Sequence, residues 1–358
     1  MNFLNPYIFI PLIIAFVAVV FFTPFVRKTL ISANITDNPI VSEHSHKQGT
    51  PTMGGLAIIL GLVLIACIYS QNQILLITTG VMIAAAIIGL FDDLLGLKTK
   101  EIQKVAKNVT SQVVELGRLK LQPGEEARVA TPKAKEDVDK LIKQEKIEII
   151  RELPIKSEIS EREKILSQIF VSLFLVVSGA VPFVLSDFNM GLLSIPIAII
   201  GVVGAINAVN LIDGMDGLAS GVMGIASLFC AIFSLLTSRF DIAIAFMALA
   251  GVCFGFLVYN RMPASIFMGD TGAFALGGFY ASASILGDLI VFAVIVIAVP
   301  IISVVISLLH RSHVIKLPVE PLHHTLNYKG LSEGKIVALY WVTTLVICII
   351  ALYFYKLF

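Results

Sequence analysis

The stretch IGVVGAINAVNLIDGMDGLASGVMGIASLFCAIFSLL, residues 200–236, contains two apolar runs joined by a connector that holds Asp213 and Asp216. A membrane-spanning helix takes roughly 20 apolar residues, so the two runs indicate a pair of spanning helices. The chain as a whole is 57% apolar and only 14% charged. Similar apolar runs recur at 7–26, 53–70, 74–91, 165–185, 192–210, 217–237, 240–258, 271–287, 288–309 and 336–355. We therefore predict an all-α fold, a polytopic integral membrane bundle of about ten helices.

Basic residues orient this bundle. Arg27 and Lys28 follow the first apolar run, and no basic residue precedes it. Because cytoplasmic loops are enriched in Lys and Arg, the N-terminus is expected outside, and an even number of spans returns the C-terminus outside. Every Lys and Arg except Arg239 and Lys356 then lies on the cytoplasmic side.

Residues 98–164 interrupt the apolar pattern with a stretch rich in Lys and Glu. Within it, KAKEDVDKLIKQEKIEIIREL, residues 133–153, has apolar residues at helical spacing and predicts a solvated helix. We interpret the chain as one transmembrane unit, 1–358, with a charged cytoplasmic insertion at 98–164. The insertion is either a charged hairpin without chemistry or a docking site for a partner enzyme or second subunit.

Five aspartates stand at the ends of apolar runs, and the predicted topology places all five on one side of the membrane. Asp92 and Asp93 lie in GLFDDLLG, Asp213 and Asp216 in NAVNLIDGMDG, and Asp270 in FMGDTG. A carboxylate at the centre of a membrane helix costs roughly 2.5–3.5 kcal/mol on insertion scales, so such residues are rare without a function. A divalent cation removes the repulsion between converging carboxylates, which predicts a Mg²⁺-dependent site.

Spacing adds detail to this prediction. Asn207, Asn210, Asp213 and Asp216 recur at intervals of three, on one helical face, although Asp and Asn also cap helix ends. The adjacent Asp92 and Asp93 diverge by about 100° on a helix. One of them is expected to face the metal or the nucleophile, and the other an adjoining base or helix.

Basic and imidazole groups complete the candidate site. His323 and His324 lie together in PLHHTLNYKG, where an imidazole can contact a diphosphate or move a proton. Lys47 and Lys164 are candidate phosphate contacts, although a single loop lysine is usually only a solvated residue. Lys47 precedes GTPTMGG, whose Thr52 and glycines are expected to line a phosphate channel.

Together these segments resemble the polyprenyl-phosphate N-acetylhexosamine-1-phosphate transferases, and within them the phospho-N-acetylmuramoyl-pentapeptide transferase branch. The resemblance covers nearly the whole chain in motif order. It rests on KQGTPTMGG at 47–55, GLFDDLLG at 89–96, EKILSQ at 163–168, NAVNLIDGMDGLA at 207–219, FMGDTGAFALGG at 267–278 and PLHHTLNYKG at 321–330. It implies ten transmembrane helices, a plasma-membrane location and an active site on the cytoplasmic face.

The resemblance also implies roles for single residues. Asp270 would be the Mg²⁺ ligand, and Asp92 the base or nucleophile contact with Asp93 beside it. His323 would be the essential first histidine, with His324 next to it, and Lys164 the basic residue of the fourth helix. The uridine and diphosphate pocket would be shaped by Lys47, Asn207, Asn210, Asp213, Asp216 and Phe267. The implied partners are a UDP-linked amino sugar or glycopeptide, a polyprenyl phosphate and a second copy of the chain, with no nucleic acid.

Two departures leave the donor open. Thr325 stands where the family has a third histidine, and the acidic residue expected shortly after is absent at Leu326-Asn327. The insertion before EKILSQ is several tens of residues long. Both favour a divergent branch, such as one acting on a pseudomurein-type glycopeptide. The alternatives are an N-acetylglucosamine- or N-acetylgalactosamine-1-phosphate transferase and, from another class, an ion-coupled transporter.

Overall fold

The protein divides into two compact units in a computed structural model. The structure describes residues 6–36, 49–97, 99–116, 119–129, 132–156, 159–179, 181–182, 184–185 and 188–354. The membrane unit comprises Met1–Asp37, Gly49–Asp93 and Ile159–Phe358, and the insertion unit comprises Asn38–Gln48 and Leu94–Glu158. Each unit has its own hydrophobic core.

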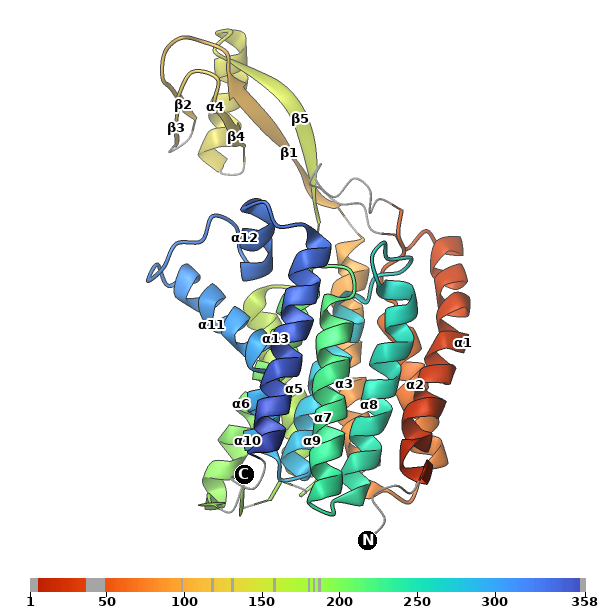
Figure 1. Ribbon diagram of the computed structural model, residues 1–358. Helices are drawn as coiled ribbons and strands as arrows, with labels where there is room; N and C mark the ends of the chain where they lie inside the picture. Colours follow the sequence, from red (N-terminus) through yellow and green to blue (C-terminus); the bar gives the residue numbers. More distant parts are fainter. Residues whose placement is uncertain are drawn as a thin grey trace. The chain divides into compact units, whose positions relative to one another are not determined.

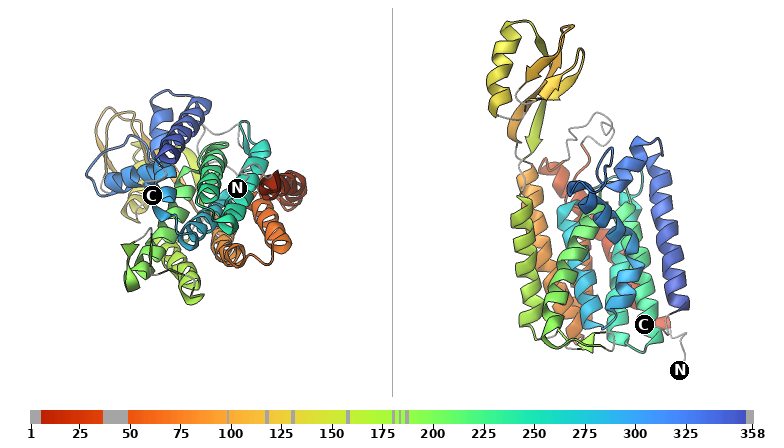
Figure 2. Two further views of the ribbon diagram at one scale, coloured as in Figure 1. Left: turned by 60° about the horizontal axis from the view of Figure 1, so that its bottom comes forward. Right: turned by 90° about the vertical axis from the view of Figure 1, so that its left-hand side faces the viewer.

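The membrane unit is built from helices that run side by side (Figures 1 and 2). They are α1 (Ile10–Ser32), α2 (Gly55–Ile68), α3 (Gln73–Gly96), α5 (Glu161–Val177), α6 (Ser194–Ile212), α7 (Leu218–Leu236), α8 (Phe240–Asn260), α9 (Gly269–Leu286), α10 (Ile290–Val296), α11 (Ala298–Arg311), α12 (Leu322–Tyr328) and α13 (Glu333–Tyr353). Short 3₁₀ turns stand at Pro6–Phe9 and Gly191–Leu193, and a small hairpin pairs β6 (Val184–Leu185) with β7 (Phe188–Asn189).

The predicted count of about ten spans is not confirmed. Among the described residues, six helices are long and apolar enough to cross a membrane, namely α1, α3, the α6 helix with its preceding 3₁₀ turn, α7, α8 and α13. The count becomes seven if α10 and α11, which meet at a bend of 73°, form one span. The other predicted runs contain helices α2, α5 and α9, which are not among these spans.

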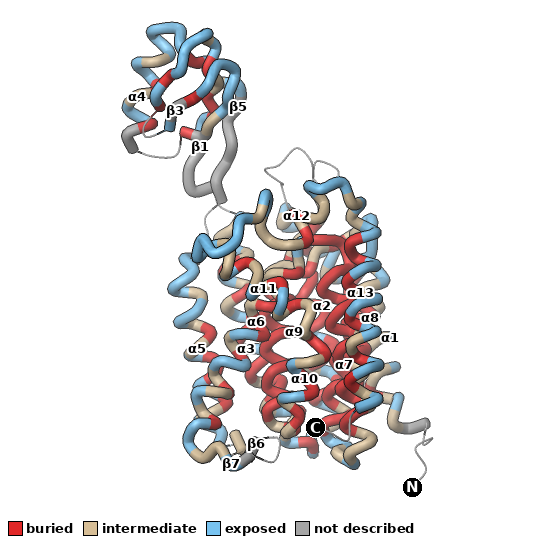
Figure 3. Tube along the Cα trace, turned by 60° about the vertical axis from the view of Figure 1, so that its left-hand side comes forward, coloured by how far each residue is buried: buried red, intermediate tan, exposed pale blue. Residues whose placement is uncertain are grey.

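The core of the membrane unit lies around α7, α8 and α9, where buried residues are concentrated (Figure 3). Small residues allow close packing there: a Cβ on Gly251 would lie 2.3 Å from the Leu12 carbonyl oxygen, and one on Gly255 would lie 2.7 Å from that of Phe16. Glycines four residues apart are a common way for membrane helices to approach each other. The outer apolar side chains of α1 and α13 are exposed, as faces that contact lipid are expected to be.

The first turn of α1 and the last turn of α13 lie at the same end of the bundle (Figure 1). The prediction that both termini face the same side requires this arrangement. A polar link joins the α7–α8 and α9–α10 connections: Arg239 donates to the carbonyl oxygens of Gly287 (2.6 Å) and Asp288, and its guanidinium lies 3.6 Å from the Asp288 carboxylate.

The insertion unit corrects the all-α prediction. It holds an antiparallel sheet of order β4-β1-β5, from β4 (Glu126–Arg128), β1 (Thr99–Asn108) and β5 (Ile147–Lys156). A second pair joins β2 (Val114–Leu116) to β3 (Leu119–Leu121), and α4 (Pro132–Lys143) packs against this unit's core. The solvated helix predicted over 133–153 is therefore correct for its first half only. Isoleucines at 147, 149 and 150 are β-branched and favour a strand.

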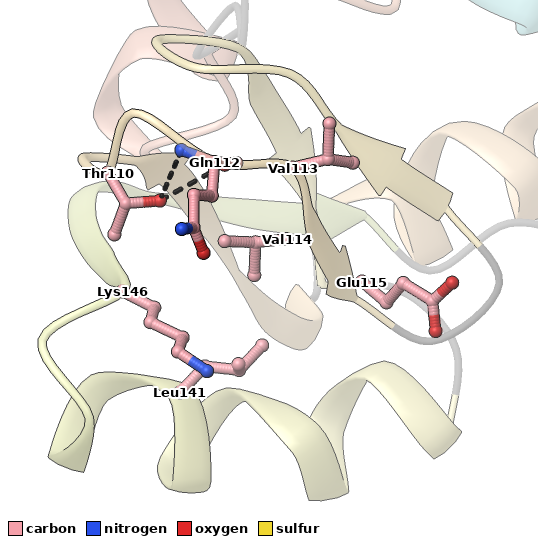
Figure 4. A pocket seen from close by; sticks show the side chains of 7 residues that line it. All are labelled: Thr110, Gln112, Val113, Val114, Glu115, Leu141 and Lys146. Carbon is pink, nitrogen blue, oxygen red and sulfur yellow. Dashed lines mark hydrogen bonds between the residues drawn. The ribbon is translucent and has the colours of Figure 1, made fainter.

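One hollow of the insertion unit, of about 260 Å³, lies between the turn after β1 and α4 (Figure 4). Its lining residues are Thr110, Gln112, Val113, Val114, Glu115, Leu141 and Lys146. The fully buried Asn108 shapes the turn, because its amide donates to the carbonyl oxygens of Gln112 and Leu121. None of the predicted site residues lines this hollow.

Candidate active site

The two adjacent aspartates at the end of α3 point to different partners. Asp92 is buried, and its Oδ1 accepts a hydrogen bond from the Ile159 backbone amide at 2.9 Å. Its Oδ2 lies 2.5 Å from the Lys164 ammonium. Asp93 instead accepts hydrogen bonds from the start of α9, at Asp270 and Thr271. The predicted divergence of the pair is confirmed, since one carboxylate faces a cation and the other faces a helix end.

Lys164 is held by a capping box at the start of α5. Ser160 accepts a hydrogen bond from the Glu163 backbone amide, and the Glu163 carboxylate accepts from the Ser160 amide at 3.0 Å and from its hydroxyl at 2.6 Å. This reciprocal arrangement satisfies two amides that a helix start would otherwise leave without partners. The next residue, Lys164, therefore projects from a fixed first turn. Its ammonium lies 3.3 Å from the Asp270 carboxylate as well as 2.5 Å from that of Asp92.

Asp270 connects this pair of helices to α6. Its Oδ1 accepts a hydrogen bond from the Asn210 side chain at 2.7 Å. One helical turn earlier, Asn207 donates to the Gln168 side chain at 2.6 Å, and Gln168 lies one turn beyond Lys164 on α5. Four helices, α3, α5, α6 and α9, thus contribute to one polar cluster inside an apolar bundle. Because one ammonium faces two carboxylates, the trio of Asp92, Lys164 and Asp270 has a formal charge of −1.

The segment PTMGG pairs with FMGD through its backbone. Phe267 donates to the Pro51 carbonyl oxygen at 2.8 Å, and Gly54 and Gly55 donate to those of Phe267 and Met268 at 2.8 and 2.9 Å. A Cβ on Gly55 would lie 2.2 Å from Gly272, so this approach requires glycine. The predicted Thr52 and Phe267 therefore lie on paired segments, and the glycines act here in packing. The structure brings these two sequence motifs together at the start of α9.

The histidine pair packs against the connector that follows α6. A Cβ built on Gly214 would lie 2.5 Å from His323 Nε2 and 3.1 Å from His324 Nε2. The two imidazole rings lie 4.4 Å apart, and His323 is fully buried with its ring edge-on to Tyr340. Thr325, at the position of the family's third histidine, donates to the Val319 carbonyl oxygen and so has a structural partner.

The connector also holds Asp213 and Asp216. Asp213 caps the end of α6, where its amide donates to the Asn210 carbonyl oxygen. Asp216 is buried, and its Oδ2 accepts from the Ala264 amide at 2.8 Å while its own amide donates to the Glu333 carboxylate at 2.9 Å. The four polar residues at intervals of three therefore diverge: Asn210 joins the carboxylate cluster, whereas Asp216 fastens the connector to its neighbours.

Sequence reasoning and structure differ at several positions. Lys47 lies outside the described residues. Gln168, Thr271 and Gly214 hold the site together but are absent from the predicted set. Only their position indicates a role, because each lies in one of the sequence motifs above, beside a predicted site residue or one helical turn from it. A small or neutral side chain inside a charged motif gives no indication by type that it contacts the charged ones.

Comparison with known proteins identifies the family of this chain. Glycosyl transferase family 4 matches residues 155–288, and the phospho-N-acetylmuramoyl-pentapeptide-transferase signature 1 matches residues 47–59. The chain is 58% identical over 341 residues to a Methanothermobacter thermautotrophicus protein named "Putative phospho-N-acetylmuramoyl-pentapeptide-transferase", covering 95% of this chain and 96% of the relative. It is 32% identical over 338 residues to the phospho-N-acetylmuramoyl-pentapeptide-transferase of Alkaliphilus metalliredigens, covering 92% and 91%.

The helical membrane unit and these matches define a polytopic membrane transferase of glycosyl transferase family 4. Within that class, the chain belongs to the phospho-N-acetylmuramoyl-pentapeptide transferase family. These matches give no support to the alternative of an ion-coupled transporter. The carboxylate cluster and the Gly214–histidine contact both lie on segments that carried the resemblance.

Proposed function

We propose that this protein transfers a phospho-N-acetylmuramoyl-pentapeptide-like glycopeptide from a UDP-linked donor to a polyprenyl phosphate. A phosphate oxygen of the lipid forms a bond to the β-phosphorus of the donor. The bond from that phosphorus to the oxygen bridging the α-phosphate breaks, and UMP leaves with the electron pair. The product is a polyprenyl-diphospho-sugar. The observation that carries this proposal is the cluster of Asp92, Lys164, Asp270 and Asn210 on four helices of a chain in this family.

The chemistry of phosphoryl transfer is mostly positioning and charge neutralisation. Lys164 offers a fixed ammonium, and the Asn210 amide holds the orientation of the Asp270 carboxylate. A phosphate monoester is largely ionised near pH 7, so the acceptor needs no strong base. We therefore propose that Asp92 orients the acceptor or the metal, with the role of base as the alternative. His323 and His324, packed on Gly214, are proposed to contact the donor diphosphate.

Mg²⁺ is the proposed cofactor, and the donor chemistry of the cluster fits it. Mg²⁺ binds oxygen and takes one or two carboxylates together with waters and substrate phosphates. Such a site does not need three acidic ligands, which agrees with the finding that no group of three or more His, Cys, Asp or Glu is placed to hold a metal among the described residues. Asp270 would hold the ion, and Asp92 would orient it if Asp92 acts on the metal rather than on the acceptor. When bound, it supplies positive charge that neutralises the diphosphate.

The location and the substrate pocket are further proposals. We infer that the carboxylate end of the bundle faces the cytoplasm, because Lys and Arg enrichment favours that orientation, and the family resemblance supports a plasma-membrane location. Asn207, Asp213, Asp216, Thr52 and Phe267 are proposed to shape the pocket for the uridine and diphosphate, either by contact or by holding its backbone. Lys47 remains a proposed phosphate contact. A homodimer is expected from the family resemblance.

A release assay tests the proposed function. Purified protein in detergent is given Mg²⁺, undecaprenyl phosphate and a panel of UDP-sugars, and UMP and lipid-linked product are followed, with Asp270→Ala as the control. UMP release with UDP-muramoyl-pentapeptide or a related UDP-glycopeptide, lost in Asp270→Ala, is the expected result. Release only with UDP-N-acetylglucosamine or UDP-N-acetylgalactosamine would move the protein to the alternative donor. No release from any donor by folded protein would overturn the transferase reading.

A further inference from the structure

The start of α9 is half-buried at Gly269 and Asp270, leads directly into the core of the bundle, and lacks a cap of its own. The residue before it, Met268, makes no side-chain capping hydrogen bond, and Thr271 to Ile285 are buried without interruption. The first amides of any helix have no partner within that helix. In a buried place, each such amide needs a partner from elsewhere. The first turn of α9, which carries Asp270, therefore depends on a neighbouring element.

Asp93 on α3 is that neighbour. Its Oδ1 accepts a hydrogen bond from the Asp270 amide at 3.0 Å, and its Oδ2 accepts from the Thr271 amide at 2.9 Å and the Thr271 hydroxyl at 2.6 Å. Both carboxylate oxygens are thus engaged in capping another helix. Negative charge is also favoured there by the partial positive charge of a helix N-terminus.

Two glycines make the approach possible. Gly89 lies four residues before Asp93, on the same face of α3. A Cβ on Gly89 would lie 2.2 Å from the Asp270 carbonyl oxygen, so any larger residue would displace the start of α9. Gly269 has φ +73°, and a Cβ there would lie 2.6 Å from Asp93 Oδ2. Glycine is therefore required on both helices: Gly89 leaves room for the Asp270 backbone, and Gly269 leaves room for the Asp93 carboxylate.

The cap from Asp93 also affects the orientation of the Asp270 side chain. With its amide fixed by Asp93, Asp270 directs its carboxylate to Asn210 at 2.7 Å and to Lys164 at 3.3 Å. Asp92, one residue from Asp93, contacts Lys164 but neither amide of the α9 start. The two adjacent acids thus act on different parts of Asp270: one is joined to its carboxylate through Lys164, and the other to its backbone.

We propose that Asp93 is a positioning residue that caps α9 in trans and thereby fixes the direction of the Asp270 carboxylate, and that it is not a base. The effect on activity rests on the proposed transfer reaction. The capping itself concerns the fold and is tested without turnover, so the two proposals fail in distinguishable ways.

Amide hydrogen exchange tests the cap directly. Peptides that cover residues 268–274 are compared in the full-length protein, in Asp93→Ala and in Asp92→Asn, with the emission of the single tryptophan, Trp341, as the check of folding. Loss of the cap is expected to speed exchange of these peptides by about tenfold or more in Asp93→Ala, because two part-buried amides lose their acceptor. Asp92→Asn is expected to leave the exchange rate of these peptides unchanged. Unchanged exchange in folded Asp93→Ala would overturn the proposal.

Thr271 offers a second variant that leaves the carboxylate in place. Thr271→Val removes one of the three hydrogen bonds, and Thr271→Ser retains it. We expect Thr271→Val to lower kcat several-fold and raise the Mg²⁺ concentration for half-maximal activity, with rescue by Thr271→Ser. Thr78→Val, which removes a buried hydroxyl bonded within α3, is the matched control and should match the parent protein. Equal kinetics for Thr271→Val and Thr78→Val would contradict the positioning role.

The pH dependence separates positioning from base catalysis. If Asp93 positions Asp270, Asp93→Asn is expected to lower the rate while the shape of the kcat/KM profile against pH is kept. If Asp93 is the base, the acidic limb of that profile disappears in Asp93→Asn. Loss of the limb with normal exchange at 268–274 would overturn the proposal.

Discussion

Two groups of charged residues in the membrane unit, one around Arg239 and one around Lys164, have different surroundings. At the α7–α8 and α9–α10 connections, one arginine meets one aspartate and two backbone carbonyl oxygens. In the cluster of α3, α5, α6 and α9, one lysine meets two carboxylates that are carried by separate helices. The first arrangement is balanced in formal charge, whereas in the second two carboxyl groups face a single ammonium.

We interpret the difference as one between a structural link at Arg239 and the proposed functional site at Lys164. The Arg239–Asp288 pair needs no further ligand, because its charges are balanced and the arginine also donates to two backbone carbonyl oxygens. It links the α7–α8 connection to the α9–α10 connection. An excess charge held away from water costs free energy unless a cation offsets it. Hydrogen bonds from Asn210 to Asp270 and from the Ile159 amide to Asp92 offset part of this cost and hold the two carboxylates in place.

The largest effect is expected at Lys164. Lys164→Met keeps the length of the side chain but removes the ammonium between Asp92 and Asp270, so the two acids repel each other without a fixed counter-charge. We expect UMP release to fall by about 10²–10³-fold, the size typical for loss of a preorganised electrostatic group. Initial rates of release at saturating donor measure it.

Lys164→Arg is the paired variant. It keeps the charge, but a planar guanidinium does not replace a compact ammonium at a distance of 2.5 Å. A rate between those of the parent protein and Lys164→Met is expected. A parental rate in Lys164→Met would refute a functional role for the cluster's cation.

A smaller loss is expected from Gly214→Ala. The added methyl group would lie 2.5 Å from His323 Nε2 and must displace the imidazole pair, while no polar group is removed. We expect the KM for the UDP donor to rise by about tenfold, which corresponds to about 1.4 kcal/mol of lost donor binding. Gly204→Ala on α6 is the matched control, because a Cβ there meets nothing within 4 Å. Equal KM values for the two variants would show that the histidine pair does not contribute to donor binding.

The sequence predicted the acids of this site better than their geometry. An aspartate at the end of an apolar run is costly, and that cost was sufficient to single out Asp92, Asp93 and Asp270. Which of the adjacent pair faces the cluster depends on the rotation of α3 about its axis. Tertiary packing sets this rotation, through contacts such as that of Gly89 with Asp270.

The fold shows the same limit. Apolar length located the helices, but it did not distinguish a complete span from the short α2 or from the bend between α10 and α11. In the insertion, helical spacing of apolar residues persists beyond Lys143, although residues 147–156 form a strand. Pairing with β1 over most of its length decides that strand, and a partner more than 40 residues away is not visible in a local pattern.

At the charge-balanced link between Arg239 and Asp288, a substitution is expected to lower the stability of the fold without lowering the catalytic rate. Arg239→Met removes hydrogen bonds from a charged donor to two carbonyl oxygens and leaves Asp288 without its counter-charge. Hydrogen bonds to charged groups contribute about 1.5–3 kcal/mol, so a lower thermal midpoint is expected. Trp341 emission during heating measures it. A reduced rate of UMP release per folded molecule would contradict the separation of structural and functional charges.

The smallest effect is expected where an ion pair is exposed. Arg311, at the end of α11, contacts Glu161 at 2.6 Å and Glu320 at 2.7 Å, and Glu161 lies three residues before Lys164. The side chains of Arg311 and Glu161 are 49% and 76% exposed, so water and salt screen the pair. Arg311→Ala is expected to cost about 0.2–1 kcal/mol of stability at low ionic strength and less at high salt.

Arg162→Ala is the matched control for this variant. Arg162 is an exposed arginine on the same turn of α5, and it has no ion pair among the described residues. We expect both variants to release UMP at the parental rate, because the capping box of Ser160 and Glu163 already fixes the first turn of α5. A loss of activity confined to Arg311→Ala would show that α11 helps to position Lys164, and the cluster would then depend on a fifth helix.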